Sequence, residues 1–388
     1  MLALGGAELS SPKQTTAERR ASLFPYYAGF SEVFVQDVLI ALQANTDHII
    51  LDPWNGSGTT TTVAKRAGLE SIGIDLNPAL AVVAKARLAS DKNVTVARNL
   101  VRGGSRKVSA AFLREVCHPA YNSGTRSILL LAIFRLVRRK LRDKDCVATN
   151  PTWWQSSRSE VKQVISAIAK SHLDAELAEL GSKLRTADCA TRTSLVRADI
   201  LSASLPKVRA DIIISSPPYL TRIDYVKATL PELLVLSLLD EFSIDQMRRS
   251  MIGSPVVGCG PNYMPRGIGA YAKSVLFQIA SHGSKASKTY YLAFFSTYIS
   301  KMFASFEALA KFARPGAKMV LVVQGSHYKE IFVDLAQLSI ELATSAGFNF
   351  VSRADFRFKQ SFAQLNPRAS GYNMDTARET VLLFERPL

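Results

Sequence analysis

Apolar and polar residues follow two different periods along the first part of the chain. Short apolar runs over 48–52 and 71–75 are typical of buried strands, whereas 60–67 and 78–90 have the spacing of helices. Pro78 opens the second helix, a position that suits proline because the first N–H groups of a helix have no partner inside it. The order strand, turn, helix, strand, helix predicts a βαβ unit and a parallel sheet.

The same alternation of strands and helices returns after residue 190 and continues to the C-terminus. Strands are predicted over 193–199, 210–215 and 318–324, with a closing pair over 348–356 and 379–385. Helices are predicted over 33–42, 225–239, 291–312 and 329–346. We therefore expect one α/β domain formed by 23–98 and 191–388, with a loop-rich, Gly- and Lys-containing region over 240–290.

Residues 99–190 interrupt the α/β pattern and are predicted to form a mainly helical, basic insertion. They contain sixteen Lys or Arg and eight Asp or Glu, so their surplus of eight is half of the net charge of +16. A helix over 126–142 carries much of this charge beside an apolar stripe. Two interpretations stay open for it, a surface that faces nucleic acid and an ordinary amphipathic helix with a solvated charged side.

The composition narrows the possible partners and the compartment. A net charge of +16 favours a polyanionic partner, because each phosphate that is contacted releases a counterion, although a high pI can also serve solubility alone. The four cysteines form no C-x-x-C pair and have no histidine cluster nearby, so we expect no disulfides, no metal site and a cytoplasmic location. Residues 1–22 lack the pattern of a signal peptide and are predicted to be flexible. The longest apolar run, 128–134, is too short to span a membrane.

A glycine-containing turn after the first strand is the first candidate site. It reads Asp52-Pro-Trp-Asn-Gly-Ser-Gly58, and Asp75 ends the next strand. Glycines let a ligand approach the backbone closely, and the acidic residue can accept hydrogen bonds from both hydroxyls of a ribose. This suits any nucleoside cofactor, nicotinamide dinucleotides included, although the turn lacks the third glycine of the dinucleotide fingerprint. A tight turn that binds no ligand is the alternative.

A second candidate site follows the apolar strand over 210–215. It reads Ser215-Ser-Pro-Pro-Tyr219, and its two prolines fix φ and remove two N–H donors. The carbonyls around them are therefore held in fixed directions at the end of a strand, where open α/β sheets bind their ligands. Tyr219 can stack on an extruded base while Ser216 and a neighbouring carbonyl accept hydrogen bonds from its amino group.

Taken together, the two sites resemble those of the DNA amino-methyltransferases, the family that makes N4-methylcytosine or N6-methyladenine. The resemblance rests on Asp52-Pro-Trp-Asn-Gly-Ser-Gly-Thr-Thr60, on Gly73-Ile-Asp-Leu-Asn-Pro78 and on Ser216-Pro-Pro-Tyr219, with Phe24-Pro-Tyr-Tyr-Ala28 similar to an upstream cofactor-binding segment. It implies a Rossmann-like α/β methyltransferase fold with a mostly parallel seven-stranded sheet, a closing antiparallel strand and a helical insertion. It also implies S-adenosyl-L-methionine as the cofactor.

The resemblance further assigns roles to individual residues. Asp52, Gly56 and Gly58 would line the methionine part of the cofactor, Asp75 would bind the ribose hydroxyls, and Asp199 would contact the adenine amino group. The implied cofactor-binding residues are Tyr26, Asp52, Pro53, Trp54, Gly56, Gly58, Thr59, Asp75, Asn77 and Asp199. The implied catalytic residues are Ser216, Pro217, Pro218 and Tyr219.

The residue at the head of the second motif indicates which base is modified. A serine, here Ser216, resembles the cytosine-N4 subgroup, whereas an aspartate would indicate adenine N6. The chain has no Pro-Cys pair to supply a thiolate for attack on cytosine C6, which argues against C5 methylation. We therefore expect a site-specific DNA methyltransferase that acts on cytosine N4 of a base flipped out of the duplex, with a cognate restriction or defence subunit as a candidate partner.

Other functions stay open from the sequence. They are an adenine-N6 DNA methyltransferase, an RNA methyltransferase that acts on a base amino group, a catalytically silent nucleic-acid-binding subunit and, least favoured, a nicotinamide-dependent oxidoreductase. Recognition of the DNA sequence is expected from the basic insertion and the loop-rich region, where Asn262, Tyr263 and Arg266 are either candidate readers of base edges or ordinary loop residues.

Overall fold

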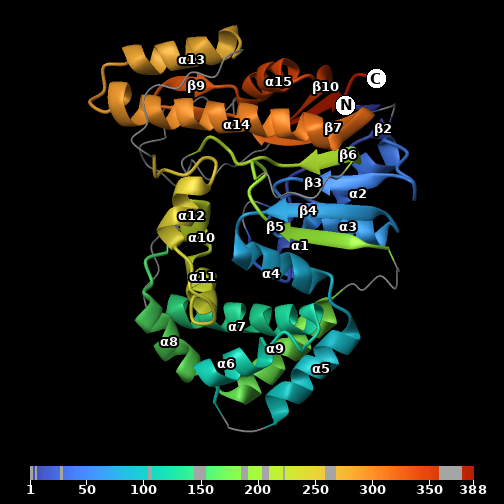
Figure 1. Ribbon diagram of the computed structural model, residues 1–388, viewed down its shortest axis with the longest axis vertical. Coiled ribbons are helices and arrows are strands. Elements are labelled where there is room, and N and C mark those ends of the chain that lie inside the picture. The colour runs from blue at the N-terminus through green and yellow to red at the C-terminus, as the bar shows by residue number, and fades with distance from the viewer. Residues whose placement is uncertain are drawn as a thin grey trace.

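The computed structural model describes residues 3–4, 7–26, 29–103, 107–143, 154–184, 191–202, 209–221, 223–257, 268–357 and 378–388. Figure 1 shows a sheet in the middle of the molecule, helices above it and a separate group of helices at the opposite end. The candidate readers Asn262, Tyr263 and Arg266 lie outside the described residues. In the described part of the chain, no helix combines the length and the apolar character needed to cross a membrane.

Seven strands form the central sheet. They are β3 (Ile49–Asp52), β4 (Glu70–Asp75), β5 (Thr193–Arg197), β6 (Ala210–Ser215), β7 (Ala313–Gln324), β10 (Asn349–Arg357) and β11 (Arg378–Glu385). Their order is β10-β11-β7-β6-β3-β4-β5. The neighbours from β7 to β5 are parallel, and β11 runs antiparallel to both β7 and β10. The prediction of a mostly parallel seven-stranded sheet with one antiparallel strand is confirmed.

Helices cover both faces of this sheet. They are α2 (Glu32–Ala41) and α3 (Thr59–Arg66) on one face, and α13 (Ala270–Ser281), α14 (Leu292–Phe312) and α15 (Leu335–Ser345) on the other. Ile212 and Val320 belong to the core under α2 and α3, whereas their neighbours in sequence, Ile213 and Met319, belong to the core under α14. Successive side chains of a strand point to opposite faces, so a strand covered on both sides is apolar throughout.

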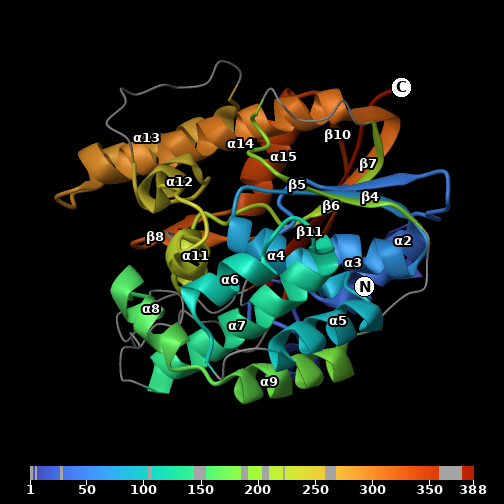
Figure 2. The same cartoon turned by 60° about the horizontal axis from the view of Figure 1, so that its bottom comes forward.

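A helical bundle, residues 91–183, is inserted between α4 (Pro78–Arg87) and β5. It contains α5 (Asp91–Arg102), α6 (Ala110–Val116), α7 (Ser123–Asp143), α8 (Arg158–Ser166) and α9 (Lys170–Lys183). Figure 2 brings the helical bundle to the front, with α7 crossing its middle. Every residue from Ile128 to Phe134 of α7 is buried, so this helix is covered on all sides and forms the core of the bundle.

Three arginines of α7 pair with acidic side chains of the same molecule. Arg138 is buried, and its guanidinium donates to the two carboxylate oxygens of Glu232 at 2.8 and 2.7 Å. Arg135 and Arg139 both form ion pairs with the buried Glu176. Three of the basic side chains expected on the charged face of this helix are thus paired with acids of the same molecule. This argues against the interpretation that α7 faces nucleic acid.

Two predicted helices are interrupted in the structure. The helix expected over 225–239 is two helices, α10 (Tyr225–Ala228) and α11 (Leu230–Leu236), and Pro231 lies in the first turn of α11, where no N–H is needed. The helix expected over 329–346 begins late, because β8 (Ser326–Tyr328) and β9 (Ile331–Val333) first form a hairpin. The side chain of Asp334 then caps α15 by accepting hydrogen bonds from two backbone N–H groups.

The regions predicted to be loop-rich or flexible contain some regular structure. The described part of 240–290 includes α12 (Ile244–Ser250), most of α13 and the start of the π-helix η1 (Ser287–Tyr291) beyond it. The N-terminal segment includes β1 (Ala3–Leu4), β2 (Ala7–Glu8) and α1 (Thr16–Ala21). A capping box between Thr15 and Glu18 starts α1, a local signal that composition does not reveal.

Removing the charge of Arg138 should destabilise the fold strongly. Arg138→Ala leaves the carboxylate of Glu232 buried without its partner, and we expect the free energy of unfolding to fall by about 3–5 kcal/mol. Urea denaturation followed by circular dichroism measures this loss.

The matched control is Arg102→Ala. Arg102 is 57% exposed and contacts Asp174, which keeps its closer partner Arg98. Its replacement should cost no more than about 1 kcal/mol. Equal losses in the two variants would contradict the importance given to the buried pair.

Candidate functional site

A cleft opens at the carboxyl ends of β3, β4, β5 and β6. Most of the expected site residues line this cleft, namely Tyr26, Pro53, Trp54, Gly56, Asp75, Asp199, Ser216, Pro217, Pro218 and Tyr219. The cleft therefore brings both sequence motifs together at the edge where open α/β sheets bind ligands. Four expected cofactor residues, Asp52, Gly58, Thr59 and Asn77, do not line it.

Gly58 and Thr59 shape the turn beneath the cleft. Gly58 has a φ of 83° and is the residue that precedes α3, which begins at Thr59. A Cβ on Gly58 would lie 2.7 Å from the Cβ of Ala84 in α4. Glycine is required here both for the left-handed backbone and for the close packing of α3 on α4.

The carboxylate of Asp75 sits at the end of β4 and faces the cleft. It accepts hydrogen bonds from the backbone N–H groups of Gly56 and Asn77, each at 2.7 Å. Burial raises the pKa of Asp75 to about 6, while these two hydrogen bonds act in the opposite direction. Asp75 thus holds the glycine turn and the start of α4 at a fixed distance and still presents an acceptor to the cleft.

Asp52 lies below the cleft and connects the two motifs. It is 1% exposed, and its carboxylate accepts hydrogen bonds from the hydroxyl of Ser215 and from the backbone N–H of Trp54. Burial raises the pKa of Asp52 to about 6, against the effect of the hydrogen bonds from Ser215 and Thr60. In this geometry Asp52 supports the cleft from beneath and does not form part of its wall.

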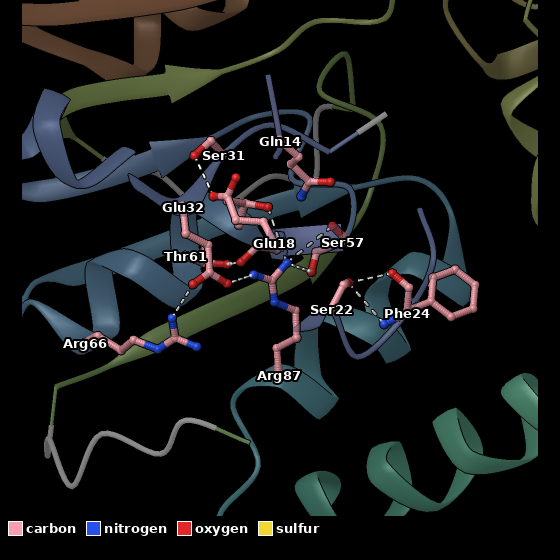
Figure 3. Close-up of polar contacts among 12 residues, drawn as sticks. Gln14, Glu18, Ser22, Phe24, Ser31, Glu32, Ser57, Thr61, Arg66 and Arg87 are labelled. Atoms are coloured by element: carbon pink, nitrogen blue, oxygen red, sulfur yellow. Dashed lines mark hydrogen bonds and ion pairs between the residues drawn. The ribbon is translucent and has the colours of Figure 1, made fainter. Parts of the chain in front are cut away.

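Asn77 and Arg87 support the cleft through other contacts. Asn77 caps α4 and donates from its side chain to the hydroxyl of Thr229 at 2.8 Å, where α10 meets α11. Figure 3 shows the guanidinium of Arg87 between Glu32 and Ser57. Arg87 donates to the backbone carbonyl of Ser57 at 3.3 Å and so fastens the glycine turn to α2, a role that no sequence motif indicated.

The second motif is held by a network of hydroxyl groups. The Ser216 hydroxyl lies 3.1 Å from both the Tyr219 hydroxyl and the carbonyl oxygen of Val322 in β7. The backbone N–H of Tyr219 donates to the hydroxyl of Tyr225 at 3.0 Å, and burial raises the pKa of Tyr219 well above its ordinary value. The Tyr219 hydroxyl therefore stays protonated, and the segment is fixed before any ligand arrives.

Side chains that come from distant parts of the chain complete the site. Tyr298 of α14 donates from its hydroxyl to the carbonyl of Pro218 at 2.7 Å. Ser250, at the end of α12, and the next two residues, Met251 and Ile252, close one side of the cleft. Sequence reasoning missed these residues and Tyr225, because only tertiary packing brings them to the catalytic segment.

The cleft is acidic and has aromatic walls. Asp75 and Asp199 line it together with Tyr26 and Trp54, and the described lining contains no Lys or Arg. The indole Nε1 of Trp54 is buried without a hydrogen-bond partner among the described residues. Carboxylates and aromatic faces both attract a cation, and a buried donor without a partner needs an acceptor. The site therefore suits a positively charged ligand that also carries hydrogen-bonding groups.

Comparisons with known proteins find similarity over different parts of the chain. Residues 11–86 match a family model of N6/N4-type enzymes described as DNA methylase. The chain is 21% identical to the Type II methyltransferase M.BsoBI of Geobacillus stearothermophilus over 439 residues, which cover 93% of this chain and 84% of that protein. Both matches confirm the resemblance to the DNA amino-methyltransferase family.

Solved structures show more distant similarity. An S-adenosylmethionine-dependent methyltransferase of Methanosarcina mazei has a TM-score of 0.36 at 9% identity, covering 90% of this chain and 97% of that one. The rRNA methyltransferase AviRa of Streptomyces viridochromogenes has a TM-score of 0.30 at 14% identity, and the match covers 97% of this chain and 96% of that one.

Replacing Asp52 by Asn should change how stability depends on pH. The pKa of Asp52 in the fold, about 6, exceeds the ordinary value of an aspartate, so the folded chain binds this proton more tightly than the unfolded chain. Its contribution to stability is then present at low pH and is lost as the pH rises from about 4 to about 6. Relative to wild type, Asp52→Asn should therefore gain stability between about pH 4 and about pH 7.

Urea denaturation at about pH 4 and at about pH 7 measures how much stability Asp52→Asn gains relative to wild type. The control is Asp47→Asn, on the exposed loop before β3. A difference between wild type and Asp52→Asn that stays constant with pH would show that the carboxyl does not titrate in this range.

Proposed function

We propose that this chain, whose residues 11–86 match the DNA methylase family, transfers a methyl group from S-adenosylmethionine to an exocyclic amino group of a base in DNA. The observation that carries the proposal is a single cleft lined by the glycine turn, by Asp75 and by Ser216–Tyr219. We further propose cytosine N4 as the target, because a serine heads the second motif. The family resemblance makes a cognate restriction or defence subunit a candidate partner.

The cleft fits the cofactor by charge and by shape. S-adenosylmethionine, when bound, supplies an electrophilic methyl group on a positively charged sulfur. Asp75 and Asp199 would favour that charge and bind polar groups of the nucleoside, and Tyr26 and Trp54 would flank it. The backbone of Gly56, which has a φ of 51° and no side chain, leaves room for the ligand beside Tyr26.

The catalytic segment would act by positioning the nucleophile. A base amino group is a poor nucleophile because its lone pair is delocalised into the ring. The hydroxyl of Ser216, which can donate to the Val322 carbonyl, keeps lone pairs that accept one N–H bond of the amino group. The carbonyl of Pro217 would accept the other N–H bond, and the lone pair of the nitrogen then points at the methyl group.

The fixed geometry of the two prolines supports this arrangement. Pro217 and Pro218 hold their carbonyls in place, and the Pro218 carbonyl already accepts a hydrogen bond from Tyr298. Most of the rate would come from orientation, with little acid–base chemistry. The cleft is open to solvent, which would take up the proton that the nitrogen loses.

Tyr219 would receive the base that leaves the duplex. Its side chain lines the cleft next to the hydroxyl of Ser216. Stacking of a base on such a ring is worth about 1–3 kcal/mol, against an unstacking cost of a few kcal/mol. The ring therefore offsets part of the cost of base extrusion.

Tyr219→Ala should separate methyl transfer from cofactor binding. Loss of the stacking contact should lower the transfer rate about 5- to 150-fold, while the affinity for S-adenosylmethionine measured by calorimetry stays nearly unchanged. Asp75→Ala should instead act first on cofactor binding and lower the affinity for S-adenosylmethionine. If both quantities fall together in Tyr219→Ala, the role given to this ring is wrong.

The methylated nucleoside identifies the target base. We expect purified protein, tritiated S-adenosylmethionine and unmethylated DNA to give N4-methylcytosine after digestion to nucleosides. N6-methyladenine would keep the enzyme and refute the choice of base. Label in an RNA control and none in DNA would refute the choice of nucleic acid.

A further inference from the structure

A second cavity lies next to the cleft, between α14 and the segment 249–257, which contains the last two residues of α12 and the residues after it. One face of α14 lines it with Phe294, Thr297, Tyr298 and Lys301. The facing segment contributes Arg249 and Gly253, among others, and we call this cavity the basic groove. Met251 lines both the basic groove and the cleft, so the two are adjacent.

The basic groove runs along the back of the catalytic segment. Its wall residue Tyr298 is the one whose hydroxyl donates to the Pro218 carbonyl at 2.7 Å. Gly253 has a φ of 74°, and a Cβ on it would lie 3.1 Å from the backbone carbonyl oxygen of Tyr219. A ligand in the basic groove is therefore close to the residues that would hold the target base.

The charge of the basic groove is opposite to that of the cleft. Arg249 and Lys301 line it, and its described lining contains no Asp or Glu. The ammonium of Lys301 donates to the backbone carbonyls of Arg249 and Ser250 at 3.0 and 2.8 Å. Lys301 thus fixes the segment that carries Arg249, and the third hydrogen of its ammonium can reach another acceptor.

We propose that the basic groove binds the phosphodiester backbone beside the target nucleotide, with Arg249 and Lys301 contacting the phosphates. This inference rests on the proposed function. An extruded nucleotide stays attached to its neighbours through its phosphates, so a base that stacks on Tyr219 brings those phosphates next to the catalytic segment. Arginine and lysine are the side chains that neutralise them.

Several basic side chains elsewhere are less suited to this contact, because acids already neutralise them. In the helical bundle, Arg135, Arg138 and Arg139 already pair with acids, and Arg98 and Arg102 share Asp174. The cleft itself is lined by Asp75 and Asp199, which would repel a phosphate. Of the two cavities that meet at Met251, only the basic groove has the charge that attracts a phosphodiester.

The test measures how salt affects the affinity of the protein for a duplex oligonucleotide that wild type binds. In Arg249→Gln, the slope of log affinity against log salt concentration should become smaller by about 0.9, the value expected for one lost phosphate contact. Binding of S-adenosylmethionine, measured by calorimetry, should stay unchanged. The matched control is Arg114→Gln, since Arg114 is exposed on α6 of the helical bundle.

A second pair of variants tests the basic groove without removing a basic residue. Thr297 is an exposed groove residue one helical turn before Lys301. Thr297→Glu places a negative charge in the groove and should weaken DNA binding, whereas Thr297→Gln, of similar size, should not. A loss in both variants would indicate a steric effect and would count against the charge argument.

The outcomes separate this inference from the proposed function. If wild type methylates DNA but Arg249→Gln keeps the wild-type salt slope, the basic groove is not the phosphate site and the function stands. If the salt slope of Arg249→Gln is smaller than that of wild type by about 0.9 but wild type transfers no methyl group to any oligonucleotide that it binds, the groove stands and the function fails. If wild type binds the cofactor but no DNA, both proposals are overturned.

Discussion

The hydroxyl of Ser215 donates a hydrogen bond to the buried carboxylate of Asp52, and this contact ties the end of β6 to the end of β3. Each candidate site starts from one of these residues, because the glycine turn follows Asp52 and the catalytic segment follows Ser215. The two strands are parallel neighbours, so both sites emerge at the same edge of the sheet. The distance between them is then set by the register of a rigid sheet and not by the length of a loop.

Regions of opposite charge lie next to each other in this molecule. The cleft has carboxylates and aromatic rings, the adjoining basic groove has Arg249 and Lys301, and Met251 lies between them. In the helical bundle, many of the basic side chains are instead paired with acids. The net charge of +16 therefore says little about where a polyanion would bind, since paired arginines count toward it as much as those without an acidic neighbour.

Local patterns allowed the sheet and most of the cleft wall to be predicted. The apolar run before Ser215 and the glycines after Asp52 carry their own conformational signal, which does not depend on distant partners. The partners of Arg138 and Asn77 could not be predicted, because Glu232 lies 94 residues from Arg138 and Thr229 lies 152 residues from Asn77. For the same reason the basic character of α7 suggested a surface, whereas packing makes it a core helix.

The position of the helical bundle in the chain has a consequence for the order of folding. Ser71 in β4 pairs with Thr193 in β5, 122 residues later, so this strand pair closes a loop that contains the whole bundle. Contacts between residues so far apart in sequence form slowly. Because β5 leads directly into Ala198, Asp199 and Ile200, one wall of the cleft is added only when this edge strand docks. We therefore expect ligand binding to be acquired late, so that a chain able to bind is one that has finished folding.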